Sequence, residues 1–268
     1  MVMLNSPEPI YPHKLRRLYW PFLGLAESCR SVIGTVAGAF TLETLRYTIP
    51  RFTFLGPEIS TPQKRLGLFA LVHGDEPAGS GALLKLLQTV AAQPSLAAGY
   101  DLVVYPVCNP TGYEDDTRHN RRGADLNREF WHGSAHPEIG ILEEELRSQS
   151  FDGIIALHAD DSSDGLYGYA HDRLLNKELL EPALRASEGI LPRNRGTVID
   201  GFAASDGVIG DCFKGILAPP PGQKPRPFEV IFETPARSPL ELQIEATHSA
   251  LLSILATYRG FAAYAQDL

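Results

Sequence analysis

The chain has 268 residues, of which 44% are hydrophobic and 21% are charged, as in ordinary globular proteins. A chain of this length buries enough surface to form a core without disulfides or structural metals. The formal net charge of −8 argues against a general attraction to nucleic acid or to an anionic membrane. The composition therefore predicts a globular protein that binds neither.

Cysteine usage and the N-terminal residues bear on the cellular location. Cys29, Cys108 and Cys212 lie far apart and form no CxxC pair, which is typical of a reducing compartment. The first 20 residues contain no apolar segment after a basic start, so no signal peptide is expected. Apolar runs are also too short to span a membrane. We expect a cytoplasmic protein, and the sequence does not indicate its oligomeric state.

The first half of the chain alternates between helix-like and strand-like patterns. Apolar residues recur at helical spacing over 14–36, which predicts a helix. Strands are predicted over 44–53, 66–72 and 102–107, the second of which is an uncharged apolar run typical of a buried strand. A helix is predicted over 81–92, between the last two strands.

The same alternation continues in the second half. A helix is predicted over 138–149, and buried strands over 153–157 and 228–232. A final helix is predicted to begin near Pro239, because proline is favoured in the first turn. The proline-rich segment 218–227 is incompatible with helix or central strand, and we expect a surface loop there.

Strands that alternate with helices predict an α/β fold with a mixed, largely parallel sheet sandwiched by helices. The chain has no linker-like segment or shift in composition, so we expect residues 1–268 to form a single domain. An alternative is a short helical N-terminal extension, over residues 1–40, packed on that domain.

Ionisable residues follow three of the predicted buried strands. His73 and Glu76 come after strand 66–72, and His158 follows strand 153–157. Glu233 follows strand 228–232. Because ligands bind at the carboxyl ends of strands in open α/β sheets, we expect these side chains to lie at one edge of the sheet.

These residue types are suited to a catalytic zinc site. Catalytic zinc commonly takes two histidines and one glutamate, and keeps one position for water. His73, Glu76 and His158 could form that set for one Zn²⁺ per chain, and Glu233 could serve as general base on the water. A second metal near Asp75, Asp160 and Asp161 is a less favoured alternative, because these aspartates could simply solvate the loops.

Three motifs resemble the zinc carboxypeptidase family. The segment HGDEPAG at 73–79 resembles its His-x-x-Glu zinc motif. The segment RHNRRGADLNR at 118–128, within which NRRGADLNREF begins at Asn120, resembles its Arg-x-Asn-x-x-Gly-x-Asp-x-Asn-Arg signature. The segment NPTGYEDDTR at 109–118 resembles the stretch that precedes this signature. Murein-peptide amidases and the succinylglutamate desuccinylase/aspartoacylase branch share parts of the pattern. The resemblance covers residues 65–240.

The resemblance assigns a role to each strand-end residue. It implies that His73, Glu76 and His158 bind zinc in a metallocarboxypeptidase-like domain. It also implies that Glu233 is the catalytic base and proton shuttle.

The resemblance further implies that the arginine-rich segment binds substrate. Asn127 and Arg128 would hold the substrate carboxylate, which matches the bidentate geometry of arginine. Arg118 would polarise the scissile carbonyl and stabilise the oxyanion. Asp125 could orient a metal ligand or an arginine, or it could cap a helix.

The chain departs from digestive carboxypeptidases in one loop. Those enzymes carry a tyrosine before the catalytic glutamate, but residues 211–221 contain no tyrosine and Phe213 is the only aromatic residue there. Tyr167 and Tyr169, which follow His158, could replace it in substrate binding. Packing within a strand is an equally good explanation of these two tyrosines.

The sequence thus predicts a zinc-dependent hydrolase, a metallocarboxypeptidase or amidase, that cleaves an amide or peptide bond next to a free carboxylate. The expected substrate is a small peptide or an N-acyl amino acid. One alternative is an N-acyl amino acid deacylase, a branch that often carries an extra β domain after the catalytic one. Another is a binding protein that keeps the metal pocket without turnover, against which the presence of Glu233 argues.

Overall fold

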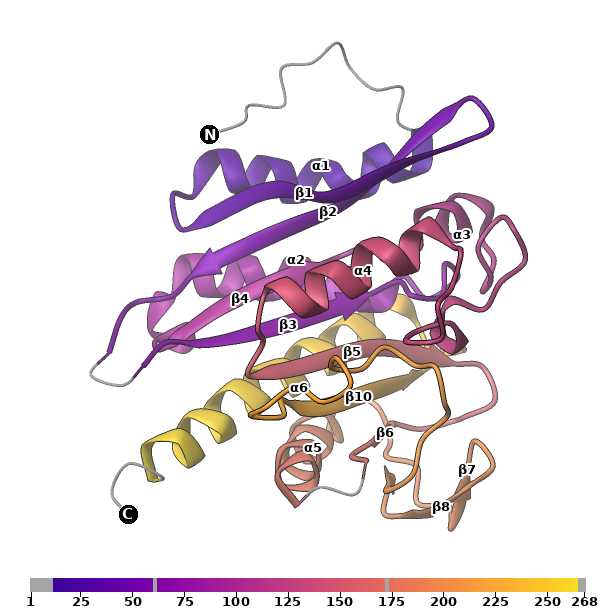
Figure 1. Cartoon of the computed structure of the whole chain (residues 1–268). Helices are drawn as coiled ribbons and strands as arrows, with labels where there is room; N and C mark the ends of the chain where they lie inside the picture. Colours follow the sequence, from indigo (N-terminus) through magenta and orange to yellow (C-terminus); the bar gives the residue numbers. More distant parts are fainter. Residues whose placement is uncertain (1–11, 60–61, 172–173, 265–268) are drawn as a thin grey trace.

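The computed structural model describes residues 12–59, 62–171 and 174–264. Its strands join in one ten-stranded sheet with helices on both faces (Figure 1). In chain order the elements are α1 (His13–Ser28), β1 (Val32–Leu42), β2 (Leu45–Leu55), β3 (Lys64–Ala70), α2 (Ala78–Ala92), η1 (Pro94–Ala97), β4 (Tyr100–Tyr105), α3 (Pro110–Asp115), η2 (Leu126–Arg128), α4 (Pro137–Ser148), β5 (Gly153–Asp160), β6 (Tyr167–Tyr169), α5 (Leu174–Ser187), β7 (Val198–Ile199), β8 (Phe202–Ser205), β9 (Val208–Ile209), β10 (Phe228–Pro235) and α6 (Leu240–Tyr264).

The centre of the sheet is parallel and its flanks are mixed. The strand order is β1-β2-β4-β3-β5-β10-β6-β9-β8-β7. Strands β4, β3, β5 and β10 run parallel to one another, whereas β1, β2 and β6 join by antiparallel pairing. The predicted α/β fold with a mixed sheet and a parallel core is therefore confirmed.

Central strands are buried on both faces and separate two apolar cores. Leu68 and Ile155 face the core formed with α2, α5 and α6. Phe69 and Ala156, the adjacent residues on the same two strands, face the core formed with α4. This alternation follows from the two-residue repeat of a strand and explains why these segments read as continuous apolar runs.

Most predicted elements are present, but the first helix is shorter than expected. Helix α1 ends at Ser28, and the extended backbone of Cys29 leads into β1. The predicted helix over 14–36 is therefore wrong beyond Ser28, because Val32, Ile33 and Val36 are β-branched and pair with β2. Residues 32–40 extend the sheet and are not helical, while residues 1–11 lie outside the described residues. The expectation of one domain over 1–268 stays a prediction.

Several short elements between His158 and Glu233 have no clear sequence signal. The sequence did not predict the helix α5 or the strands β6 to β9. These four strands extend the sheet beyond β10. The proline-rich residues 218–227 form no helix or strand, as expected. Within the described residues, no helix is both long enough and apolar enough to cross a membrane.

Candidate metal centre

The loop that carries His73 and Glu76 joins β3 to α2. Its backbone is anchored to the end of β4, because Asn109 donates its backbone N–H to the carbonyl of Leu71 at 2.8 Å. The loop also packs tightly on α3, since a Cβ atom at Gly74 would lie 2.0 Å from the carbonyl carbon of Gly112. Only glycine fits this contact, and the contact places His73 and Glu76 at the carboxyl end of β3.

The other two strand-end residues lie on adjacent strands. His158 of β5 and Glu233 of β10 are direct partners in the parallel register. Side chains of paired residues project from the same face of a sheet. Here it is the face that Ala156 and Phe69 also occupy, on the side of α4.

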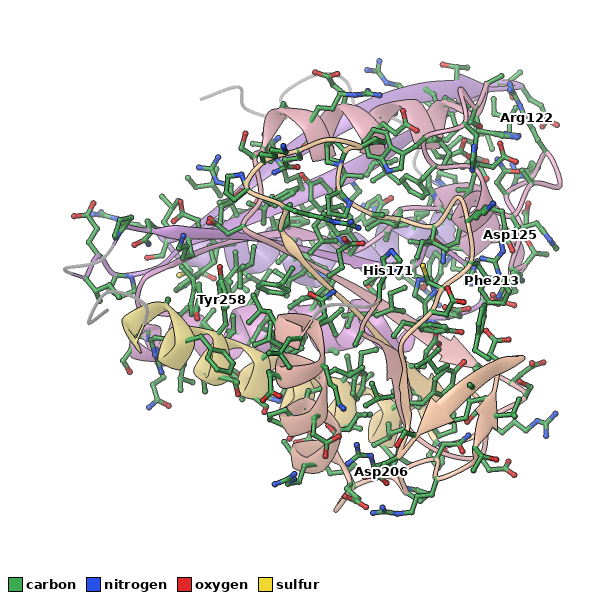
Figure 2. All side chains as sticks on the ribbon, turned by 60° about the horizontal axis from the view of Figure 1, so that its bottom comes forward. Arg122, Asp125, His171, Asp206, Phe213 and Tyr258 are labelled. Carbon is green, nitrogen blue, oxygen red and sulfur yellow. The ribbon has the colours of Figure 1, made fainter. Side chains whose placement is uncertain are left out.

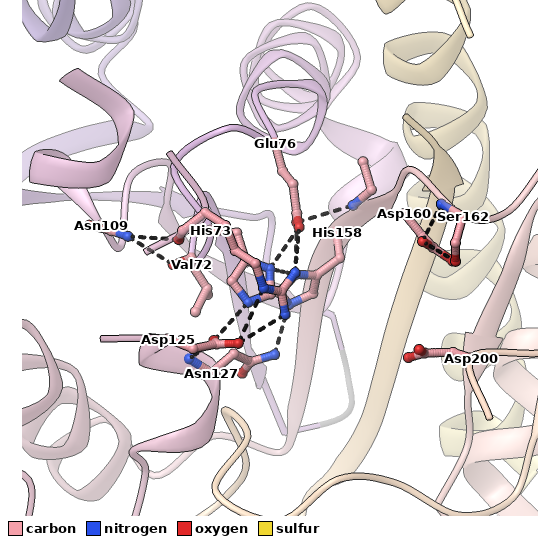
Figure 3. Close-up of polar contacts among 12 residues, drawn as sticks. Val72, His73, Glu76, Asn109, Asp125, Asn127, His158, Asp160, Ser162 and Asp200 are labelled. Atoms are coloured by element: carbon pink, nitrogen blue, oxygen red, sulfur yellow. Dashed lines mark hydrogen bonds and ion pairs between the residues drawn. The ribbon is translucent and has the colours of Figure 1, made fainter. Parts of the chain in front are cut away.

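His73, Glu76 and His158 converge on one point (Figure 3). The Nδ1 atom of His73 lies 2.7 Å from Oε1 of Glu76, and Nδ1 of His158 lies 2.9 Å from Oε2 of Glu76. The two Nδ1 atoms are 3.2 Å apart. One potential ligand atom from each residue lies within 4.8 Å of the others. The two histidines are thus close enough to bind one ion, which requires their nitrogens to lie within about 5 Å of each other.

This arrangement fits a divalent metal better than it fits a network of hydrogen bonds. The three side chains are 3–6% exposed, so water cannot solvate them freely. Two imidazole nitrogens face each other, and at most one shared proton can join them. Tetrahedral ligands at zinc distances lie about 3.3 Å from one another, close to the spacing here. His73, Glu76 and His158 are thus a suitable ligand set for zinc.

The protonation states of Glu76 and His158 suit ligation. Burial opposes ionisation of Glu76, but the adjacent His73 and His158 outweigh it and lower the pKa of Glu76 to about 2. Burial lowers the pKa of His158, which favours its neutral form. A metal ligand must be a carboxylate or a neutral imidazole, so both groups are ready to bind.

Asp125 links the candidate metal ligands to an arginine. Its Oδ1 lies 3.1 Å from Nε2 of His73, and its Oδ2 accepts hydrogen bonds from Nε and Nη2 of Arg118 at 3.2 and 3.0 Å. It also caps η2 by accepting the backbone N–H of Asn127 at 3.0 Å. Both roles considered for Asp125 are therefore present. A carboxylate on the outer nitrogen of a histidine fixes which nitrogen faces the metal.

We expect Asp125→Asn to weaken zinc binding about 10- to 100-fold, the usual effect of losing such a partner. The amide keeps the size of the side chain but loses the charge that orients His73 and Arg118. A competition titration with a chromophoric chelator measures this affinity. Asp115→Asn is a matched control, because Asp115 pairs with Arg121 outside the cavity and its loss should leave zinc affinity unchanged. Equal affinities for Asp125→Asn and the unmodified protein would contradict this role.

The arginine-rich segment contributes three of the predicted substrate-binding residues to one cavity. Arg118, Asn127 and Arg128 all line it. Arg128 stacks on the ring of Phe213, with its guanidinium carbon 4.0 Å from the ring centre. The Asn127 side chain accepts the backbone N–H of Leu217 at 2.9 Å, so it also fixes the loop that carries Phe213.

Figure 2 shows Asp125 and Phe213 at one end of the molecule and Tyr258 toward the other end. Only some of the arginines of segment 118–128 line this cavity. Arg121 instead pairs with Asp115 and donates a hydrogen bond to the hydroxyl of Tyr47.

The cavity has a volume of about 360 Å³, enough for a small molecule. Glu233 faces into it, is only 9% exposed and accepts no hydrogen bond from any described residue. Burial, followed by the charges of Glu76 and Asp160, raises the pKa of Glu233 well above its ordinary value. A buried carboxylate that takes up a proton readily is suited to act as a base in a reaction.

Tyr167 and Tyr169 of β6 line the same cavity and also pack within the sheet. Tyr167 pairs in register with Glu233 and donates a hydrogen bond to Asp160 at 2.9 Å. Tyr169 donates a hydrogen bond to Asp200. Strand packing is therefore present, and the place of both tyrosines in the cavity is compatible with substrate binding, which stays a prediction.

Sequence reasoning missed some of the cavity lining. Asp200, Cys212 and Ile216 line the cavity, but each comes from a short turn or loop between β7 and β10 without a motif. Phe213 was noted only as the aromatic residue of its loop. Within the described residues, a single group of three side chains could hold a metal, and Asp75, Asp160 and Asp161 form no second group.

Residues 62–166 match the model of the succinylglutamate desuccinylase/aspartoacylase catalytic domain, which covers the metal loop, the arginine-rich segment and β5. No curated protein matches the whole sequence significantly.

Solved structures match nearly the whole chain. A presumed metallopeptidase from Shewanella denitrificans aligns over 94% of this chain and 94% of its own, with a TM-score of 0.76 and 20% identity. The metallo-carboxypeptidase from Burkholderia cenocepacia aligns over 93% of this chain and 70% of its own, with a TM-score of 0.73 and 17% identity. The chain has a zinc carboxypeptidase-like fold. The resemblance seen in the sequence is thereby confirmed.

A third solved structure is also similar over most of the chain. A metallo-carboxypeptidase from Pseudomonas aeruginosa aligns over 91% of this chain and 69% of its own, with a TM-score of 0.69 and 16% identity. These alignments, each over more than 90% of the chain, extend well beyond residues 62–166.

Proposed function

We propose that this protein is a zinc-dependent hydrolase that cleaves an amide or peptide bond next to a free carboxylate. One observation carries the proposal: His73 and Glu76, which converge with His158 in one buried group, line the same cavity as the buried carboxylate of Glu233. Two histidines and one glutamate are a common ligand set of catalytic zinc. A nearby general base completes the minimum required for hydrolysis.

His73, Glu76 and His158 would hold the metal. When bound, a zinc ion acts as a Lewis acid and lowers the pKa of a water molecule to about 7. Glu233 would accept the proton of the attacking water and then donate it to the leaving amine. Its raised pKa supports this second step, because the protonated form is readily reached at that position.

The two arginines of the cavity would bind the anionic parts of the substrate. Arg118 lies 3.7 Å from the carboxylate of Glu76, beside the metal ligands, and it would stabilise negative charge on the scissile carbonyl oxygen. Arg128 would hold the free carboxylate, together with the amide of Asn127. Stacking on Phe213 fixes the Arg128 guanidinium and limits the entropy lost on binding.

A small peptide is the substrate that the comparisons support best. The aligned Burkholderia and Pseudomonas proteins are metallo-carboxypeptidases, and the latter is in complex with (2-guanidinoethylmercapto)succinic acid, a ligand with two carboxylates. A ligand of that chemistry agrees with a cavity in which arginines bind carboxylates. A cytoplasmic location and the lack of nucleic acid or membrane partners remain part of this proposal.

An N-acyl amino acid deacylase is the second candidate. The match of residues 62–166 to the desuccinylase/aspartoacylase catalytic domain favours it. A carboxypeptidase and an N-acyl amino acid deacylase differ in the group on the acyl side of the cleaved bond. The proposed zinc ligands and Glu233 would act on either bond, so they do not distinguish the two activities. Substrates must therefore decide between them.

The proposal can be tested by metal analysis and a substrate panel. The full chain is purified without chelator, and zinc is measured by mass spectrometry. Hydrolysis is then followed with peptides that end in different residues, a murein tripeptide and a set of N-acetyl amino acids. We expect one zinc per chain and activity on at least one class, with activity lost after chelation and restored by zinc. Zinc without hydrolysis of any class would favour the binding protein, and no zinc uptake would overturn the metal site.

A further inference from the structure

One wall of the cavity carries aspartates that have no positive partner. Asp160, Asp161 and Asp200 line the cavity, and none forms an ion pair with a described basic side chain. Figure 3 shows Asp160 and Asp200 on one side of the ligand cluster and Asp125 on the other. Arg118 pairs with Asp125 and lies on that side, whereas Arg128 stacks on Phe213.

The partners of these aspartates are neutral donors. Asp160 accepts hydrogen bonds from the backbone and hydroxyl of Ser162, both at 2.7 Å, and from the hydroxyl of Tyr167. Asp200 accepts from the hydroxyl of Tyr169. Such bonds orient a carboxylate and leave its charge uncompensated. In Figure 3 the Asp200 carboxylate points toward the side where the metal ligands lie.

The charge balance of the whole cavity is negative. Six acidic side chains and two arginines line it. Even a bound divalent cation would leave two negative charges uncompensated, if all six acids were ionised. Glu233 is a second, independent sign that the cavity receives a polar ligand, because this buried side chain faces into it without a hydrogen-bond partner. A substrate that brings only negative charge would bind against this field.

The cavity that Asp200 lines also has apolar and aromatic residues. Tyr169, Phe213, Ile216 and Ile231 line the same cavity. Tyr169, Phe202 and Phe213 are joined by edge-to-face ring contacts with centre separations of 6.1 and 4.7 Å. Apolar walls with a carboxylate match a side chain with an apolar stem and a cationic head, as in lysine or arginine.

We propose that the cavity selects amide substrates whose carboxylate-bearing residue has a cationic side chain, and that Asp200 is the specificity-determining residue. This inference rests on the proposed hydrolase function and names its substrate class. Arg128 holds the carboxylate of that residue, and Asp200 holds its ammonium or guanidinium group. Residues with a carboxylate side chain are rejected, because their charge would face unpaired aspartates.

Three substrates of matched size test this inference with the zinc-loaded full chain: N-benzoylglycyl-lysine, N-benzoylglycyl-norleucine and N-benzoylglycyl-glutamate. Norleucine has the alkyl chain of lysine without the ammonium group. A charge-assisted hydrogen bond discriminates by about 10- to 100-fold, so we expect kcat/KM for lysine to exceed that for norleucine by this factor. Glutamate should be the poorest substrate. A norleucine substrate cleaved as well as the lysine substrate overturns the inference.

Asp200→Asn separates charge recognition from structure. Asparagine tolerates the positive φ of 49° at this position and keeps an acceptor for Tyr169. We expect kcat/KM for the lysine substrate to fall about 10- to 100-fold and that for norleucine to change less than about threefold. Asp164→Asn, an exposed aspartate outside the cavity, should change neither. An equal loss on both substrates would show that Asp200 is only structural and would overturn its role.

Binding of the free amino acids keeps the test decisive if no peptide is cleaved. In that case the proposed hydrolase function fails, and calorimetric titration of the zinc-loaded protein with L-lysine, L-norleucine and L-glutamate decides the charge preference alone. If lysine binds at least about tenfold more tightly than norleucine, the result supports recognition of the cationic group by an acidic side chain. Equal binding of lysine and norleucine, or tighter binding of glutamate, overturns it.

Discussion

Glu233→Gln should abolish hydrolysis while leaving zinc bound. A general acid–base group contributes about 10²- to 10⁴-fold to a rate, so kcat should fall by at least 10²-fold. The amide has nearly the size of the carboxylate but cannot accept the proton of the attacking water. Because Glu233 is not among the three converging ligands, the zinc content should stay unchanged. The measurement is kcat on the best substrate of the panel, with zinc measured on the same sample.

Glu229→Gln provides the matched control for this loss. Glu229 lies on the same strand, is similarly buried and pairs with Arg226 outside the cavity. Glu229→Gln should reduce the stability of the fold and keep kcat within about threefold of the wild-type value. If Glu233→Gln retained most of the activity, Glu233 would not be the base. If it also lost zinc, the residue would contribute to metal binding, and the division of roles proposed here would be wrong.

His158→Ala should remove the metal and the activity with it. Loss of a residue that only supports a ligand weakens metal binding about 10- to 100-fold, so loss of a ligand itself should exceed that range. Only His73 and Glu76 would remain, three residues apart in one loop. Zinc affinity by competition titration measures this effect directly, and hydrolysis at micromolar zinc should be undetectable.

Thermal unfolding gives a second measurement of the same site that does not depend on activity. Zinc at 100 times its dissociation constant should stabilise the wild-type chain by about 2.7 kcal/mol, if it binds only the folded state. For a protein of this size that raises the melting temperature by roughly 5–10 °C. His158→Ala should show no such shift.

His248→Ala is the control for a general effect of losing a buried histidine. His248 lies in α6 and contacts Thr89, away from the metal ligands. It should bind zinc like the wild type and keep its thermal shift. A zinc-dependent shift that persists in His158→Ala, or disappears in His248→Ala, would place the metal elsewhere.

The metal centre was predictable because its residues follow strong strand signals. His73, His158 and Glu233 each come at or just after a continuous apolar run, and parallel strands bring such ends to the same edge. The register then decided the details: His158 and Glu233 are direct partners and share one face. This register cannot be read from the spacing of residues in the sequence, because it depends on how β5 and β10, which are far apart in the chain, align with each other.

Other features depended on competition between local preferences. The segment after Ser28 has apolar residues at helical spacing, yet it forms β1 because β2 offers an edge for pairing. A strand at that position gains hydrogen bonds and cross-strand contacts that an isolated helix lacks. The spacing of apolar residues gives no information on this stabilisation by pairing with β2.

The sequence by itself determined the central strands, the helices between them and the residues able to hold zinc, since burial on both faces imposes a pattern on the chain. Only the tertiary structure decided which other residues share the cavity with them. Asp200, Phe213 and Ile216 come from short turns and loops whose local sequence has no periodicity. Their positions follow from the packing of β6 to β9 beside β10, and that packing places Asp200 in the cavity that Arg118 and Arg128 also line.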